Sequence, residues 1–160
     1  MATYKNDIIL IAGSGNFAFE AANFLTKRKN LEHIVLVSNN PKISKKYKKK
    51  VSYFDIRDIE NIINFIKKKL ITKVLIIGYV QLPPIKEIKL SLSSKLILSK
   101  NFFFNNINNQ SKILKKFIES KNLKLLSQKK IFDKLLINFS DQQLRNDHKN
   151  IYRNILNNSS

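Results

Sequence analysis

Three short apolar runs lie in the first half of the chain, at residues 8–11 (IILI), 34–37 (IVLV) and 74–77 (VLII). Each run is continuously apolar and rich in β-branched residues. This pattern is typical of parallel strands that are covered on both faces, whereas half-exposed strands alternate apolar and polar positions. The runs therefore predict three buried, parallel strands.

Two segments between these runs have apolar residues at helical spacing. The positions are Ala18, Ala21, Ala22 and Leu25 in the first segment, and Ile59, Ile62, Ile63 and Ile66 in the second. Each stripe predicts a helix with one buried face; Asn30 is expected to end the first, and Asp55 or Asp58 to cap the second. Strands that alternate with helices favour a Rossmann-like α/β fold, a parallel sheet with helices on both faces in a single domain.

Beyond Gly78 the pattern loosens. The pair Pro83–Pro84 predicts a loop, residues 113–118 predict a helix, and residues 123–126 predict a further strand. From residue 138 onward the chain is polar. We therefore expect one domain over residues 1–137, followed by a polar tail over residues 138–160.

Two of the three glycines lie between the first predicted strand and the first predicted helix, in the order Gly13-Ser14-Gly15-Asn16-Phe17-Ala18. This is G-x-G-x-x-A, a variant of the dinucleotide-binding fingerprint, in which glycines permit a tight turn and let the backbone approach a phosphate. The amides that begin the helix would donate to the anion. The alternative is that the glycines serve only to reverse the chain.

The third glycine follows the strand at 74–77, and it predicts a second contribution to the same site. Ligands of doubly wound sheets bind beyond the carboxyl ends of the strands, which places Gly78, Tyr79 and Gln81 on the same rim as the first turn. A nicotinamide cofactor also requires an acidic residue after the second strand, where this chain has Ser38, Asn39 and Asn40. An NAD-type binding module is therefore a weaker alternative, and no Walker motif occurs.

The net charge of +19, from 30 Lys and Arg against 11 Asp and Glu, favours anionic partners. Lys, Asn and Ile are abundant throughout, however, as an AT-rich genome would produce, so we expect nucleic acid to be an unlikely partner. An anionic membrane surface remains a second alternative. The absence of cysteine, of a signal peptide pattern and of a run long enough to cross a bilayer predicts a cytoplasmic protein, with peripheral attachment to the inner membrane left open.

The two glycine turns together resemble the N-terminal domain of LpxI-type UDP-2,3-diacylglucosamine pyrophosphatases, hydrolases of lipid A biosynthesis in Gram-negative bacteria. Residues 12–18 (AGSGNFA) are similar to the family pattern AGxGxLP, and residues 77–83 (IGYVQLP) are similar to AGxVxRP. The resemblance covers roughly residues 7–136. It implies a domain that binds a UDP-sugar lipid or another nucleotide ligand, with Gly13, Ser14, Gly15, Asn16, Gly78, Tyr79 and Gln81 as the ligand-binding residues.

The chain departs from the family pattern at several positions. Ala18 replaces a proline, Leu82 replaces a basic residue, and residues 105–107 (NNI) carry no carboxylate. In the family, a C-terminal domain supplies the catalytic acid and the metal chemistry, and residues 138–160 resemble only its beginning. We therefore expect the chain to lack that domain and to need a C-terminal-domain polypeptide as partner before it can hydrolyse a substrate with Mg²⁺.

The carboxylates are few and dispersed, so the sequence assigns no catalytic residue, no metal ligand and no cofactor to this chain itself. Asp55 and Asp58 are better explained as helix caps, and His33 as a structural residue. Whether the chain is an enzyme is left open.

Overall fold

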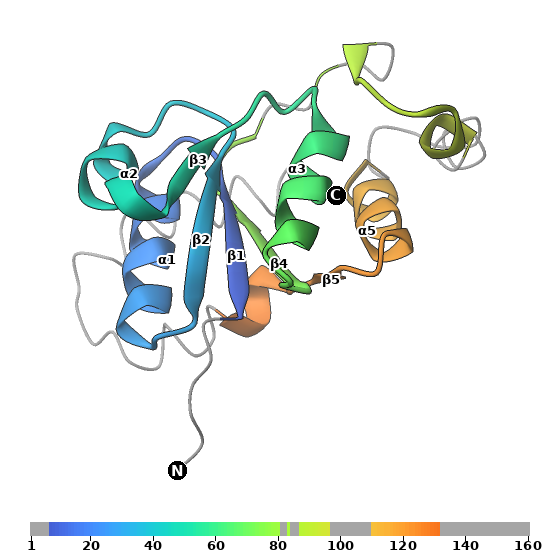
Figure 1. Cartoon of the computed structure of the whole chain (residues 1–160). Coiled ribbons are helices and arrows are strands. Elements are labelled where there is room, and N and C mark those ends of the chain that lie inside the picture. Colours follow the sequence, from blue (N-terminus) through green and yellow to red (C-terminus); the bar gives the residue numbers. More distant parts are fainter. Residues whose placement is uncertain (1–6, 81–82, 84–86, 97–109, 132–160) are drawn as a thin grey trace.

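A computed structural model describes residues 7–80, 83, 87–96 and 110–131 of the chain (Figure 1). The strands are β1 (Ile8–Ala12), β2 (Leu31–Leu36), β3 (Val51–Tyr53), β4 (Lys73–Ile77) and β5 (Lys124–Leu125). The helices are α1 (Asn16–Lys27), α2 (Pro41–Lys46), α3 (Ile59–Lys68) and α5 (Gln110–Ser120), with a 3-10 turn η1 (Lys48–Lys50). Residues 92–96 and 128–131 are also helical. Residues 132–160 lie outside the described part, so the predicted boundary at residue 138 stays a prediction.

The five strands form one sheet in the order β3-β2-β1-β4-β5, and every pair of neighbours is parallel. The chain builds the sheet outward from β1 through β2 to β3, and then returns to place β4 on the other side of β1. The switch point of this topology therefore lies between β1 and β4, where doubly wound sheets bind their ligands. The predicted Rossmann-like α/β fold is confirmed.

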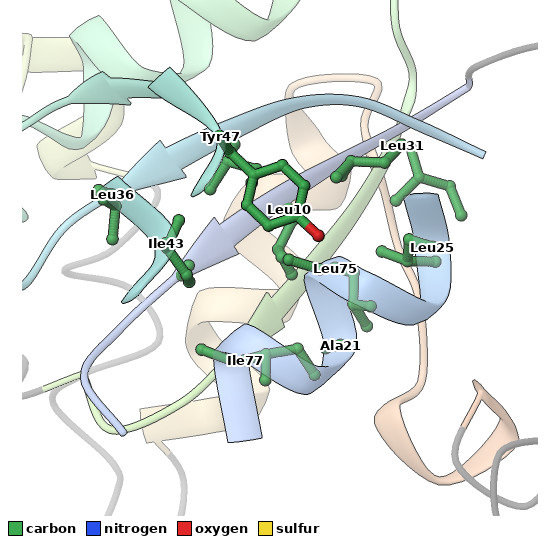
Figure 2. Close-up of a cluster of buried hydrophobic side chains, with 14 residues drawn as sticks. Leu10, Ala21, Leu25, Leu31, Leu36, Ile43, Tyr47, Leu75 and Ile77 are labelled. Carbon is green, nitrogen blue, oxygen red and sulfur yellow. The ribbon is translucent and has the colours of Figure 1, made fainter. Parts of the chain in front are cut away.

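Helices cover both faces of the sheet (Figure 1). On one face, Leu10 of β1 and Leu75 of β4 belong to a buried cluster with Leu25 of α1 and with Ile43 and Tyr47 at α2, whose side chains point toward one another in Figure 2. The alternate residues of β1 belong to a second cluster with α3 and α5, which includes Ile9, Ile11, Ile63, Ile66 and Phe117. Two covered faces explain why β1 is apolar at every position.

The helix α2 and the turn η1 were not predicted from the sequence. Asn40 begins α2 as its N-cap, with Pro41 at the first helical position, and only Ile43 in the helix is buried. In the part of the chain that the structure describes, no helix combines the length and apolar character needed to cross a bilayer.

Candidate functional site

The turns that follow β1 and β4 are joined by backbone hydrogen bonds. Gly13 donates to the Ile77 carbonyl at 2.8 Å, and Ser14 and Tyr79 exchange N–H to O=C bonds of 3.1 and 3.0 Å as an isolated antiparallel bridge. The Ser14 hydroxyl also donates to the Tyr79 carbonyl at 3.4 Å. The two glycine turns thus meet on one rim of the sheet, and their pairing bridges the switch point between β1 and β4.

Gly13 and Gly78 lack side chains because the two turns pack backbone against backbone. A Cβ on Gly13 would lie 2.3 Å from the Tyr79 carbonyl oxygen, and one on Gly78 would lie 2.7 Å from the Ser14 carbonyl oxygen. Gly78 also has a φ of +90°, which disfavours any L side chain. For these two glycines the structure provides a packing reason that does not depend on a ligand, and their predicted part in ligand binding stays a prediction.

Gly15 has different surroundings. Its φ is +101°, and a Cβ built on it would meet no heavy atom within 4 Å. Gly15 and Asn16 are both exposed, and α1 begins at Asn16 without a side-chain cap. Within the described residues, the N–H groups of Gly15 and Asn16 have no hydrogen-bond acceptor. These two unpaired donors therefore belong to exposed residues at the positive end of the α1 dipole.

Asn40 holds the first glycine turn in place. Its side chain is 4% exposed, and its Nδ2 donates to the carbonyl oxygens of Gly13 at 3.2 Å and Gly15 at 3.0 Å. Its Oδ1 accepts from the Ile43 amide at 3.3 Å and so caps α2. One buried amide thus fixes the turn after β1 to the helix after β2.

Lys42 extends from α2 to the beginning of α1. Its Nζ donates to the Asn16 Oδ1 at 2.7 Å. This contact leaves the Asn16 Nδ2 as a further donor and places a positive charge beside the exposed amides. The site is electropositive both from the helix dipole and from this lysine.

The remaining predicted residues lie as follows. Tyr79 is 69% exposed, and the bridge to Ser14 fixes its backbone next to Gly15. Gln81 and Leu82 lie outside the described residues, so their places on the rim stay predictions.

The titratable groups of the described residues have structural roles. Hydrogen bonds from the Arg57 side chain and amide lower the pKa of Asp55 to about 2, and Asp58 occupies the N-cap of α3 without a side-chain cap bond. Burial is the main cause that lowers the pKa of His33, whose Nε2 lies 3.0 Å from the Ser52 hydroxyl. Among the described residues, no group of three or more His, Cys, Asp or Glu side chains could hold a metal ion.

Sequence reasoning missed Asn40 and Lys42 as parts of the site. It considered Asn40 only as a place where a carboxylate was lacking. The signal was nevertheless present, because Asn40-Pro41 is an N-cap followed by proline at the first helical position. Lys42 stood in a lysine-rich run and could not be singled out.

Comparison with known proteins gives one family. The family model for the LpxI N-terminal domain matches residues 7–135, a range that includes both glycine turns and all five strands. No curated protein matches the chain in a sequence comparison.

Proposed function

The chain belongs to the LpxI N-terminal domain family and is an LpxI-like protein of the lipid A pathway, and from this premise we propose that it binds the nucleotide end of UDP-2,3-diacylglucosamine. The proposed site is the surface above Gly15 and Asn16. A phosphate group of the ligand accepts from their two amides at the beginning of α1.

One observation supports this proposal above the others. Among the described residues, Gly15 and Asn16 are exposed and their N–H groups have no acceptor, while Gly13 and Ser14 have their amides bonded to β4 and the turn after it. A strand-to-helix turn that served only to reverse the chain would have no need for an open surface at Gly15. A phosphate without a Cβ in its way fits this surface.

Side chains around the turn supply further contacts in this proposal. Lys42 neutralises phosphate charge, and the Asn16 Nδ2 adds a donor, because the Oδ1 of that side chain already accepts from Lys42. The exposed Tyr79 ring offers a face on which a base can stack. Ser14, Gly78 and Gly13 hold the two turns together, and Gln81 keeps its predicted place on the rim.

The proposal assigns binding, and not bond cleavage, to the described residues. They do not fit a magnesium site, since they offer no cluster of metal-binding side chains. Hydrolysis to UMP and the lipid monosaccharide phosphate therefore depends on carboxylates from elsewhere, either outside the described residues or on a C-terminal-domain polypeptide that pairs with this one. Mixing the chain with the C-terminal domain of an LpxI enzyme should give Mg²⁺-dependent release of UMP; a mixture without turnover would reject this part.

Isothermal titration with UMP, UDP, a UDP-sugar and NAD tests the binding itself. We expect heats for the uridine nucleotides, and about tenfold weaker binding for Lys42→Gln, since a charge-assisted hydrogen bond contributes about 1.5 to 3 kcal/mol. Lys45→Gln, on the same helix, is the matched control and should bind like the unchanged chain. Equal affinities for all three proteins would remove Lys42 from the site.

An NAD-type module is the alternative that the same titration addresses. It has less support, because the position after β2 where such modules carry a carboxylate is taken by Asn40, whose amide is already bonded to the glycine turn. Tight binding of NAD without binding of uridine nucleotides would replace the proposed function by this alternative.

A further inference from the structure

The solvent side of α2 and η1 carries exposed lysines, of which Lys42, Lys45, Lys46 and Lys49 are here called the lysine stripe. The first three occupy positions i, i+3 and i+4 of α2, and Lys49 lies in η1, beyond the end of the α-helix at Tyr47. Ile43 and Tyr47, on the other side of the same segment, are buried against the sheet. The core contacts therefore fix the direction in which the stripe faces.

No carboxylate of the described residues is paired with the lysine stripe. None of its four lysines forms an ion pair with a described residue, and the segment from residue 41 to residue 50 contains no acidic side chain. Lys42 and Lys46 donate to the uncharged oxygens of Asn16 and Asn23, each at 2.7 Å. Like charges at these spacings on α2 repel one another, so the arrangement has an electrostatic cost for the helix.

The lysine stripe adjoins the candidate site, because its first residue, Lys42, belongs to both. The Nζ atoms of Lys42 and Lys46 lie 5.9 and 5.3 Å from the centroid of the Phe19 ring on α1, so both lysines lie along the seam between the two helices. Lys42 also contacts Asn16 at the glycine turn. A surface that bound the stripe would thus lie beside the turn.

The chemistry of the stripe fits an anionic lipid surface better than a nucleic acid. It consists of lysine alone, whose compact ammonium acts as a point charge and lacks the rigid planar fork of arginine. The aromatic residue in the segment, Tyr47, is buried and donates its hydroxyl to Asn23, so it offers no ring for base stacking. A row of lysine charges at the surface suits the diffuse potential of an anionic bilayer.

We infer that the lysine stripe attaches the protein to bilayers that contain anionic lipids, with α2 and η1 against the headgroups. The attachment does not require the proposed function. Its benefit does rest on that function, because it would bring the glycine turn to a ligand whose acyl chains lie in the same bilayer.

The test is co-sedimentation with phosphatidylcholine vesicles, with and without phosphatidylglycerol, at physiological salt. The stripe variant carries Lys45→Gln, Lys46→Gln and Lys49→Gln, and leaves Lys42 in place because it contacts Asn16. The control carries Lys67→Gln, Lys68→Gln and Lys116→Gln, exposed positions on α3 and α5 over the opposite face of the sheet. Both triple variants have the same net charge, and circular dichroism checks that both fold.

We expect the unchanged chain and the control to bind only the anionic vesicles, and the stripe variant to bind them at least about tenfold more weakly, since one lysine near such a surface contributes about fivefold. Equal losses in both variants would overturn the inference, because general charge would then suffice. So would a lack of vesicle binding, or displacement from vesicles by an RNA oligonucleotide at the same salt. Titration with UDP is scored separately: vesicle binding without UDP binding rejects the proposed function and leaves this inference standing.

Discussion

At the scale of single residues, the glycines of the first turn have different neighbours. A Cβ on Gly13 would overlap the Tyr79 carbonyl at 2.3 Å, whereas a Cβ on Gly15 would meet nothing within 4 Å. Gly13 is also pinned on both sides, by its own bond to Ile77 and by the bridge between Ser14 and Tyr79. A clash at Gly13 can therefore be relieved only by separating β1 from β4, whereas a side chain at Gly15 would meet no clash and would cost only backbone strain, from the φ of +101°.

We predict that Gly13→Ala costs about 3 kcal/mol of unfolding free energy, at the upper end for overpacking a fixed site. Gly15→Ala should cost about 2 kcal/mol, from the strain of a positive φ in a turn that the Asn40 side chain holds at the Gly15 carbonyl. Urea unfolding of both variants measures the difference. If Gly15→Ala proved the more damaging, the turn would be fixed by contacts at Gly15 and not by the packing of the two strand ends.

Asn40 is a second residue whose substitution should affect both the stability of the fold and the candidate site. In Asn40→Asp the carboxylate keeps the cap on α2 but faces the carbonyl oxygens of Gly13 and Gly15 without a proton to donate. We predict a loss of about 2 kcal/mol at pH 7, the cost of a buried, unsatisfied polar contact, together with weaker binding of uridine nucleotides. The neighbouring exposed change Asn39→Asp is the control. Denaturant unfolding and calorimetric titration measure the two effects. If Asn40→Asp left both the stability and the nucleotide affinity unchanged, Asn40 would not be needed to hold the glycine turn.

At the scale of the elements, apolar periodicity predicted the helices and strands that have a buried face and missed those that do not. β1, β2, β4, α1 and α3 each have enough buried positions to show a pattern. The helix α2 was missed because only one of its six residues is buried and most of the others are lysines. Its beginning was readable from capping chemistry, which periodicity does not detect.

Helix ends were harder to predict than helix interiors. Three described residues that are not glycine adopt a positive φ directly after a helix: Lys29, Leu70 and Asn122. Sequence reasoning expected Asn30 to end α1, since asparagine tolerates this conformation, but the left-handed residue is Lys29. With all three glycines used at the two strand-end turns, ordinary residues must end the helices.

The candidate site was predictable where backbone chemistry dictates it. Glycines between a strand and a helix, and parallel strands whose carboxyl ends share a rim, placed Gly13, Gly15 and Gly78 together, and the structure brings them together. The Ser14–Tyr79 bridge and the contact of Lys42 with Asn16 depend on the exact register of loops and on a side chain reaching between helices. No local pattern encodes such contacts.

A cluster around Glu60 connects three elements. The Glu60 carboxylate, in the first turn of α3, accepts from the Ser91 amide and hydroxyl and from the buried Ser94 hydroxyl, and Lys121 donates to Ser94 at 2.9 Å. Burial raises the pKa of Glu60, but these hydrogen bonds and the Lys121 charge lower it by more, so the net shift is downward. The cluster ties the segment after β4 back to α3 and to the end of α5.

We predict that Glu60→Gln costs about 1 kcal/mol at pH 7 and speeds amide hydrogen exchange over residues 88–96. Because the pKa is lower in the folded state, the carboxylate contributes stability above its unfolded pKa, and that contribution disappears as the pH falls through the folded pKa. The difference between the two proteins should therefore shrink in acid. Glu119→Gln, an exposed residue whose carboxylate lies 3.9 Å from Lys115, is the control; equal exchange in both variants would show that the cluster does not hold the segment.

At the scale of the whole molecule, basic side chains far outnumber the acidic side chains that could neutralise them. The chain has 30 basic and 11 acidic residues, and the described part contains three ion pairs, Asp55–Arg57, Asp7–Lys73 and Lys115–Glu119. Folding brings the uncompensated lysines closer together than they are in the unfolded chain. Repulsion among them opposes the compact state, and the hydrophobic clusters on the two faces of the sheet must outweigh it.

Salt should therefore stabilise this protein, although salt weakens attractive surface pairs in most proteins. Raising sodium chloride from low ionic strength to 0.15 M shortens the screening length to about 8 Å, which reduces repulsion between lysines on neighbouring helices. We predict a gain of about 1 kcal/mol, seen as a rise in Tm of about 4 °C by circular dichroism. The stripe variant with Lys45→Gln, Lys46→Gln and Lys49→Gln should start at a higher Tm in low salt and gain less from added salt, because it lacks part of the repulsion. A Tm that fell with salt in both proteins would mean that attractive pairs outweigh repulsion, and the excess lysines would then carry no cost for the fold.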